Sequence, residues 1–511
     1  MAKITTIIDI GSNSARMAIF QKTSRYGFRL IHELKSKVRI SEGSYEHDSY
    51  LQKPAMQRAL NALKEFKRVS QLFKSRKLIC VATSAIRDAP NKLEFIAAVK
   101  KECGIHIKVI DGTREAFFGA VACANLLHEK SGITVDIGGG STELACIDNG
   151  IIKEMISLNL GSIRLKELFF DHNKINEAYN YTRQYVKENI KTILHFYRDS
   201  MSKSKFHIFG IGGSIRAYAK YEMNRISYPL NFLHGYELDI QTIMPHLNHI
   251  VHATTQELLA TGINLDRIDS IRPGLLILQI ILEELQAQTL IISGVGVREG
   301  VFLYDMLRNQ NWVLPTHCNP SVSSLRDTFL TCIDESKIIF KHAKNLFILF
   351  QENIKQKIYL DSQYLYHLKI ASNLYNIGTN VNFYQAHKHS SYIALHCLNY
   401  GFSHIQRYTI ATLLEFSHKK RPKTIPQSHK NLLPHEPVLH MLSFILSLSV
   451  ILAKQKNVDF KLSIRSQTQL YSLSLVVLHI TACPLPTQQA LLEIIPPKLE
   501  CYGIALEIIV D

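Results

Sequence analysis

Hydrophobic and polar positions in residues 1–305 predict strands and helices in alternation. Short β-branched or apolar runs predict strands at 4–10, 78–82, 106–110, 133–137, 143–148, 206–210 and 290–293. Apolar residues at helical spacing predict helices at 55–70, 91–102, 113–128, 176–198, 214–222 and 270–286. Strands that alternate with helices in this way indicate an α/β architecture.

The pattern changes after residue 306. Residues 309–323 carry two prolines and no periodicity, which predicts a linker, and residues 324–414 are almost wholly helical in pattern. Residues 418–430 read as a basic loop. The apolar stretch 438–453 is too short for a membrane span and predicts a buried helix. Further strands are expected at 460–464, 470–480 and 504–510. These changes predict four domains, at 1–125, 126–305, 306–425 and 426–511.

One motif occurs twice. The stretch Asp9–Phe20 recurs 127 positions later as Asp136–Ile147, with Asp, Ile, Gly, Ser and Ala at the same offsets. Each copy follows a β-branched run and continues into alternating apolar residues, so each predicts a strand, a glycine turn and a second strand. The repeat therefore predicts two similar halves with a β-hairpin in each.

The chemistry of the repeat indicates a phosphate and metal cleft. The backbone N–H groups of a glycine turn can point at an anion, whereas the neighbouring Asp9 or Asp136 would repel it unless a divalent cation lay between them. The alternative is a pair of ordinary hairpins whose Asp residues only cap the turns. For one copy the two interpretations are equally acceptable, and the repetition favours the cleft.

Four further elements are compatible with this cleft. Arg87 follows a strand, where a guanidinium could grip phosphate, although a lone Arg there could equally form a surface ion pair. Glu115 lies in a first helical turn, where an acidic residue also suits the helix dipole. Two more glycine clusters, 210–213 and 294–296, follow strands and could cradle phosphate or serve as simple turns.

Composition sets the class of protein. The chain has 511 residues, 46% hydrophobic and 20% charged, which is typical of a globular protein of several domains. The nine cysteines show no CxxC pair, which favours a reducing cytosol over a disulfide framework, and the first residues show no signal region. We therefore expect a cytoplasmic protein.

The net charge of +16 indicates a polyanionic partner. Residues 306–511 carry 20 Lys and Arg against 12 Asp and Glu, and residues 1–305 carry 39 against 31, so the excess is denser in the second part. Charge alone does not separate nucleic acid, polyphosphate and an anionic membrane, and a basic solvated surface is the alternative.

Six motifs, taken in order, resemble the exopolyphosphatase and guanosine pentaphosphate phosphohydrolase family of the actin, hexokinase and sugar-kinase superfold. They are Asp9-Ile-Gly-Ser-Asn-Ser14, Ala82-Thr-Ser-Ala-Ile-Arg87, Arg114-Glu-Ala116, Asp136-Ile-Gly-Gly-Gly-Ser-Thr-Glu143, Leu233-His-Gly235 and Ser293-Gly-Val-Gly-Val-Arg-Glu-Gly300. The resemblance implies two duplicated actin-like (ribonuclease H-like) α/β domains with a cleft between them, followed by a mainly helical HD-like C-terminal region.

The resemblance also implies roles for single residues. Glu115 matches the family's catalytic carboxylate, which deprotonates the attacking water, and Arg87 matches an arginine at the scissile phosphate. Asp9, Asp136 and Glu143 match the acidic residues tied to a divalent cation, expected to be Mg²⁺ with Mn²⁺ as a substitute. The residues expected to bind phosphate are Gly11, Ser12, Asn13, Ser14, Gly138, Gly139, Gly140, Ser141, Thr142, Gly212, Gly213, Ser214, Gly294 and Gly296.

Longer family members carry a helical module related to metal-dependent HD phosphohydrolases. Here Tyr375 and Asn376 stand where an active module would have His and Asp, and only His387 and His389 resemble its downstream histidines. Tyr375 cannot replace a histidine ligand, and Asn376 is a poor bridging carboxylate. We therefore expect a non-catalytic module, whose histidines are ordinary surface or core residues rather than metal ligands.

The predicted function is an exopolyphosphatase that releases terminal orthophosphate from inorganic polyphosphate. Hydrolysis of the 5′ γ-phosphate of guanosine pentaphosphate, or both activities, is the alternative. Less favoured are a kinase of the same superfold, for which no acceptor site is recognisable, and a non-enzymatic alarmone binder, which would not need Glu115. The expected partners are these anions, with no nucleic acid, no membrane and a possible homodimer.

Overall fold

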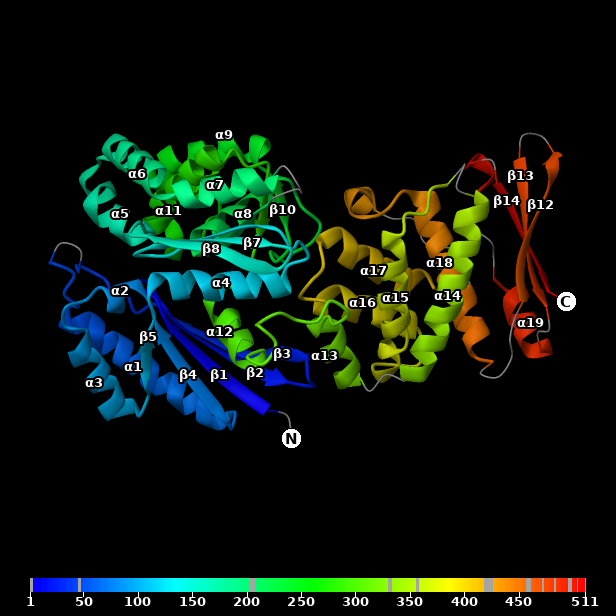
Figure 1. Cartoon of the computed structure of the whole chain (residues 1–511), viewed down its shortest axis with the longest axis horizontal. Coiled ribbons are helices and arrows are strands. Elements are labelled where there is room, and N and C mark those ends of the chain that lie inside the picture. Colours follow the sequence, from blue (N-terminus) through cyan, green and yellow to red (C-terminus); the bar gives the residue numbers. More distant parts are fainter. Residues whose placement is uncertain are drawn as a thin grey trace. The chain divides into compact units, whose positions relative to one another are not determined.

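A computed structural model describes residues 3–44, 47–201, 207–329, 333–354, 358–417, 426–455, 461–470, 473–481, 484–494, 499–502 and 504–510. The chain divides into two compact units, Met1–Asn319 and Pro320–Asp511. Figure 1 shows their secondary structure.

The first unit is built on two mixed sheets, of which the first has the strand order β3-β2-β1-β4-β5. Its strands are β1 (Lys3–Ile10), β2 (Ala15–Lys22), β3 (Phe28–Ser36), β4 (Lys77–Ala82) and β5 (Ile107–Val109). β1, β2 and β3 pair antiparallel, and β4 and β5 extend the sheet parallel to β1. We call this sheet and its helices, residues 3–110, lobe I.

The second sheet repeats this plan with the order β10-β11-β9-β6-β7-β8. Its strands are β6 (Gly132–Ile137), β7 (Thr142–Asp148), β8 (Ile151–Leu158), β9 (His207–Gly212), β10 (Glu237–Asp239) and β11 (Thr289–Ile292). β6, β7 and β8 pair antiparallel, and β9 and β11 continue parallel to β6, as β4 and β5 do beside β1. The predicted duplication is confirmed. We call residues 132–292 lobe II.

Most helices of the first unit cover the two sheets. Lobe I carries α1 (Lys53–Leu72), α2 (Ser84–Arg87) and α3 (Lys92–Cys103). Lobe II carries α5 (Ser162–Leu168), α6 (Ile175–Asn189), α7 (Lys191–Met201), α8 (Gly213–Arg225), α9 (Ile240–His252), α10 (Thr255–Ala260) and α11 (Leu265–Leu285).

Two helices, α4 (Gly112–Leu126) and α12 (Val297–Met306), lie between the sheets (Figure 1). α4 packs on β6, β7 and β8, α12 packs on β1 and β2, and the two helices pack on each other. The ring of Phe302 stacks on Phe20 with centroids 4.5 Å apart. A Cβ atom at Gly300 would lie 1.9 Å from the carbonyl oxygen of Phe118, so only glycine permits this close approach of the two helices.

The second unit is a helical layer followed by a small sheet. Its helices are α13 (Pro320–Phe329), α14 (Ile333–Ile354), α15 (Gln363–Leu374), α16 (Ala386–Cys397), α17 (His404–Phe416), α18 (Glu436–Ala453) and α19 (Leu485–Leu492). The sheet has the order β12-β13-β14, from β12 (Lys461–Leu470), β13 (Leu473–Thr481) and β14 (Ile504–Val510). In length and apolarity α18 could cross a membrane, yet 89% of it is buried inside the protein. The prediction of a buried helix at 438–453 is confirmed.

Most of the elements expected from the pattern are present, but β10, α5, α9, α10 and α12 were not predicted, and four further points differ. β3 and β8 were not predicted, because they are edge strands with many exposed positions and a weak apolar signal. The helix expected at 176–198 is two helices, α6 and α7, which meet at Ile190. α13 begins at Pro320, inside the segment expected to be a linker. Most of the basic loop at 418–430 lies outside the described residues.

Candidate active site

The two glycine turns of the repeat line one cavity of about 150 Å³ in the first unit. Each turn is closed by an equivalent hydrogen bond of its own. The Gly11 amide donates to the carbonyl of Ser14 over 3.2 Å, and the Gly138 amide donates to the carbonyl of Ser141 over 2.9 Å. The same local sequence thus folds into the same turn twice.

Fourteen of the predicted site residues line this cavity. They are Asp9, Gly11, Ser12, Asn13, Ser14, Glu115, Asp136, Gly138, Gly139, Gly212, Gly213, Ser214, Gly294 and Gly296. They come from β1, β6 and β9, from the turns that follow these strands, from the loop after β11 and from the start of α4. The tertiary structure therefore brings together motifs that are spread over nearly 290 positions of the sequence.

Five predicted residues lie behind the lining instead. Arg87 reaches the cavity through Glu115, and the carboxylate of Glu143 accepts a hydrogen bond from Ser157 over 2.9 Å. The Thr142 hydroxyl donates to the carbonyl of Leu160 over 2.6 Å. Gly140 and Ser141 complete the turn. Phosphate binding by Gly140, Ser141 and Thr142 stays a prediction, as does the role of Glu143 at a cation.

Glu115 and Arg87 form an ion pair at the cavity wall. Glu115 lies in the first turn of α4, whose N-cap Asp111 accepts a hydrogen bond from the Arg114 amide over 2.7 Å. Arg87 Nη1 donates to Glu115 Oε2 over 3.1 Å. Glu115 is 9% exposed, so its carboxylate is screened from bulk water and is fixed by the pair.

Four carboxylates share the site, and burial raises the pKa of each of them. The pKa of Asp136 rises to about 6, because of burial and the charge of Asp9. Burial and the charge of Glu143 raise the pKa of Glu115 well above its ordinary value, while Arg87 lowers it. Burial and Asp136 likewise raise the pKa of Glu143. Each carboxyl group therefore holds its proton more tightly than it would in water until cations offset the negative charge.

Arginines that were not predicted as site residues balance this charge. Arg16, Arg216, Arg267 and Arg298 line the cavity, together with Thr83, Ser84, Ser162 and Glu299. Burial and the nearby Arg16 lower the pKa of Arg216 to about 10. The Arg216 guanidinium donates a hydrogen bond to the Ser293 carbonyl over 3.2 Å. Arg298 pairs with Glu33 over 2.6 Å.

The repeat itself contained a signal for one of these arginines. Arg16 faces Asp9 across the first hairpin, and Glu143 faces Asp136 at the equivalent register of the second. The two halves therefore place opposite charges at the same structural position. Arg298 lies within the motif Ser293–Gly300, whereas no pattern around Arg267 pointed to the cleft.

The cavity offers carboxylate oxygens to the expected divalent cation. Asp9 Oδ1 is buried without a hydrogen-bond partner, which leaves one carboxylate oxygen available to a cation. In the described ranges, no group of three or more His, Cys, Asp or Glu side chains could hold a metal by itself. Mg²⁺ needs only one or two carboxylates when substrate phosphates supply the other ligands, so Asp9 and Asp136 fit this mode.

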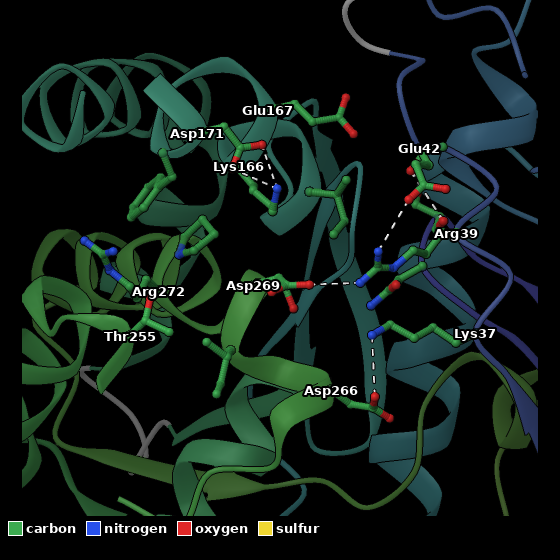
Figure 2. A pocket seen from close by; sticks show the side chains of 18 of the residues that line it. Lys37, Arg39, Glu42, Lys166, Glu167, Asp171, Thr255, Asp266, Asp269 and Arg272 are labelled. Atoms are coloured by element: carbon green, nitrogen blue, oxygen red, sulfur yellow. Dashed lines mark hydrogen bonds and ion pairs between the residues drawn. The ribbon is translucent and has the colours of Figure 1, made fainter. Parts of the chain in front are cut away.

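A second and larger cavity, of about 520 Å³, shares Ser12 and Asn13 with the first. Figure 2 shows basic and acidic side chains facing one another across it, with ion pairs between residues of lobes I and II. Ile163, Phe170 and Pro273 add apolar surface. The smaller cavity thus adjoins a larger one, which we call the chamber and which is lined by basic, acidic and apolar side chains.

Two sequence profiles match the chain. The Ppx/GppA phosphatase family matches residues 18–309, and domain III of Ppx/GppA phosphatases matches residues 319–488. This chain belongs to the Ppx/GppA phosphatase family. The crystal structure of the Aquifex aeolicus family member is 29% identical, with a TM-score of 0.50, over 61% of this chain and 99% of that chain. An exopolyphosphatase from Cytophaga hutchinsonii is 22% identical, with a TM-score of 0.54, over 60% and 98% of the two chains, and supports the fold alone.

Membership of the Ppx/GppA phosphatase family confirms the predicted family and the actin-like fold, and it makes the chain a phosphatase. The helical second unit corresponds to domain III. There, Asn376 donates to Glu335 over 2.8 Å, and the Tyr375 carbonyl accepts a hydrogen bond from Ser390 over 2.7 Å. The Asn376 side chain therefore has a structural partner, whereas the Tyr375 contact involves only its backbone.

Proposed function

We propose that this Ppx/GppA phosphatase removes the terminal orthophosphate from inorganic polyphosphate by metal-assisted attack of water. The observation that carries the proposal is the position of Glu115, a buried carboxylate paired with Arg87 on the wall of a cavity that both glycine turns line. A general base needs a fixed carboxylate within reach of the nucleophilic water, and a substrate phosphate needs donors beside it.

In this mechanism Glu115 accepts the proton of the attacking water. Its raised pKa makes it a stronger base than an exposed glutamate, and the guanidinium of Arg87 favours the ionised form that a base requires. Arg87 borders the cavity through its contact with Glu115, and its guanidinium would stabilise the charge of the phosphate oxygens. The two residues thus act as a unit.

The remaining residues hold the phosphates. The Gly11 and Gly138 amides close the two turns, so the amides from Ser12 to Ser14 and from Gly139 to Ser141 supply the N–H donors. Arg16, Arg216 and Arg298 supply positive charge. A Mg²⁺ ion held by Asp9 and Asp136 would neutralise phosphate charge that these carboxylates otherwise repel. Phosphoryl transfer depends mostly on such positioning and charge neutralisation.

A second candidate is hydrolysis of the terminal 5′ phosphate of guanosine pentaphosphate, alone or beside the first activity. The larger cavity favours it, because Phe170, Ile163 and Pro273 offer apolar surface next to the phosphate turns. A polyphosphate chain has no apolar part, whereas a nucleoside has one. The net charge of +16 favours polyphosphate instead.

One experiment separates these candidates. Phosphate release by the full-length protein is measured from long polyphosphate and from guanosine pentaphosphate side by side, with and without Mg²⁺. Faster release from polyphosphate supports the first proposal, and faster release from guanosine pentaphosphate supports the second. Transfer from ATP to an added acceptor, or binding without any hydrolysis, would contradict both.

A further inference from the structure

The larger cavity is held between the lobes by two ion pairs. Lys37 Nζ lies 3.5 Å from Asp266 Oδ1, and Arg39 Nη2 lies 2.9 Å from Asp269 Oδ2 (Figure 2). The cations belong to lobe I and the carboxylates to lobe II. Each carboxylate thus forms an ion pair with a cationic side chain that lines the larger cavity.

The segment that carries the cations is attached to the first phosphate turn. The Arg39 amide donates to the Asn13 carbonyl over 2.9 Å, and the Ser41 amide to the Ser12 carbonyl over 3.3 Å. Val38 and Ile40 are buried in the core, so the alternating Lys37 and Arg39 face the chamber. Their charges lie directly beyond the turn that is proposed to hold the terminal phosphates.

The carboxylates come from the first turns of α11. Asp266 and Asp269 are three positions apart and share a helix face, whereas Arg267 of the same helix lines the smaller cavity. Acidic residues at a helix N-terminus also complement the helix dipole. The dipole accounts for acidic residues in this turn, but it does not require them to pair with cations of the other lobe.

The charge of the chamber is balanced rather than basic. Its lining includes four basic side chains, Lys37, Arg39, Lys166 and Arg272, and five acidic ones, Glu42, Glu167, Asp171, Asp266 and Asp269. Lys166 pairs with Asp171 over 2.6 Å, and Arg39 lies 3.4 Å from Glu42 as well. A long run of phosphates entering this chamber would meet about as much negative as positive charge.

We propose that Asp266 and Asp269 are specificity-determining residues that limit how many consecutive phosphates can follow the scissile one. They occupy Lys37 and Arg39, which would otherwise bind the phosphates of a longer chain. The side chains of both pairs are between 32% and 56% exposed, and ion pairs this exposed are weak enough for substrate to compete with them. This inference rests on the proposed phosphoanhydride hydrolysis.

The test compares tripolyphosphate with long-chain polyphosphate. The double variant Asp266→Asn/Asp269→Asn of the full-length protein should raise kcat/KM for the long chain about tenfold relative to that for tripolyphosphate, through KM rather than kcat. Its KM for the long chain should also depend more steeply on salt, because two more cations meet phosphates.

Glu65→Gln/Glu102→Gln is the matched control, since it removes two carboxylates from surface ion pairs with Arg68 and Lys64, and neither residue lines either of the two cavities described above. This control should keep the native ratio of the two substrates. Lys37→Gln/Arg39→Gln should raise KM for the long chain. If the Asp double variant does not fold, an unchanged KM of this variant would overturn the proposal that these cations bind the phosphates of a longer chain.

The outcomes separate the two levels of the proposal. If the native protein hydrolyses neither tripolyphosphate nor long-chain polyphosphate, the proposed function itself is wrong. A native protein that hydrolyses both, with an Asp double variant whose substrate ratio and salt slope match those of the control, overturns the role of Asp266 and Asp269 alone.

Discussion

Arg87 Nη1 donates a hydrogen bond to Glu115 Oε2 over 3.1 Å. The arginine ends a four-residue helix after β4, and the glutamate begins α4, 28 positions later. The pair joins the predicted phosphate ligand to the predicted base. Burial and the charge of Glu143 raise the pKa of Glu115, and the charge of Arg87 partly offsets this rise.

Replacing Glu115 with Gln should lower kcat by roughly 10²- to 10⁴-fold, because the amide keeps the shape of the side chain but cannot accept the proton of water. The melting temperature should not fall, since the change removes one charge from a crowded set of buried carboxylates. Steady-state phosphate release and thermal unfolding measure the two effects. Glu102→Gln, on the exposed side of α3, is the control. Near-native turnover of the Glu115 variant would show that Glu115 is not the general base.

Removing divalent cations should abolish hydrolysis, and Mg²⁺ or Mn²⁺ should restore it. The reason is the negative charge of Asp9, Asp136, Glu115 and Glu143 beside an anionic substrate. Mg²⁺ together with phosphate should also raise the melting temperature of the native protein, but less so that of Asp9→Asn, which gives a readout besides activity. Full activity in excess chelator would contradict this prediction.

Acid should destabilise the second unit through His367. Burial lowers the pKa of His367 to about 4, and its Nδ1 has no hydrogen-bond partner. Between pH 6.5 and 4 the unfolded chain therefore binds more protons than the folded one, so stability is lost as the pH falls through this window. At pH 4.5 the loss from this group is about 2 kcal/mol.

His367→Phe keeps an aromatic ring and removes the titrating group, so it should reduce the loss of unfolding free energy between pH 7 and 4.5 by about that amount. Denaturant unfolding at the two pH values measures this. The exposed His195, changed to Gln, is the control and should leave the pH dependence unaltered. An equal acid sensitivity of the native protein and the His367 variant would show that this histidine does not contribute.

A protein that ends at Asn319 should still hydrolyse short chains but lose affinity for long polyphosphate. The basic excess is denser in residues 306–511 than in residues 1–305, so their removal should also flatten the salt dependence of binding. An end near Tyr304, which the sequence pattern suggests, would remove Trp312, whose ring stacks on Tyr304 with centroids 5.3 Å apart. Circular dichroism and thermal unfolding must first show that the shortened protein folds. Unchanged affinity and salt slope would exclude polymer binding by the second unit.

Gly300→Ala should destabilise the first unit by about 1–3 kcal/mol, because the new Cβ would overlap the Phe118 carbonyl where α12 crosses α4. Gly119→Ala in α4 is the matched substitution. There the Cβ meets only Ile211 Cδ1 at 3.5 Å, and alanine favours the helix by up to about 1 kcal/mol. Thermal unfolding should therefore move in opposite directions for the two variants, and equal shifts would show that the close approach is unimportant.

Local features of the fold were predictable because their causes are local. A hairpin is formed by neighbouring residues, so the repeat of Asp9–Phe20 in Asp136–Ile147 could reveal both hairpins and the duplication. The apolar pattern likewise predicted the buried helix α18. The edge strands β3 and β8 were missed, because exposed and half-buried residues follow one another along both strands and leave no clear alternation of apolar and polar positions.

The sequence by itself determined the family, the duplicated halves and the residues whose motifs line the smaller cavity. Only the tertiary structure decided which charged side chains meet in the two cavities. The pairs Lys37–Asp266 and Arg39–Asp269 join positions about 230 residues apart, and Arg267 reaches the cleft from a helix without a recognisable motif. Electrostatic energy depends on distance and burial in three dimensions, and neither can be read from spacing along the chain.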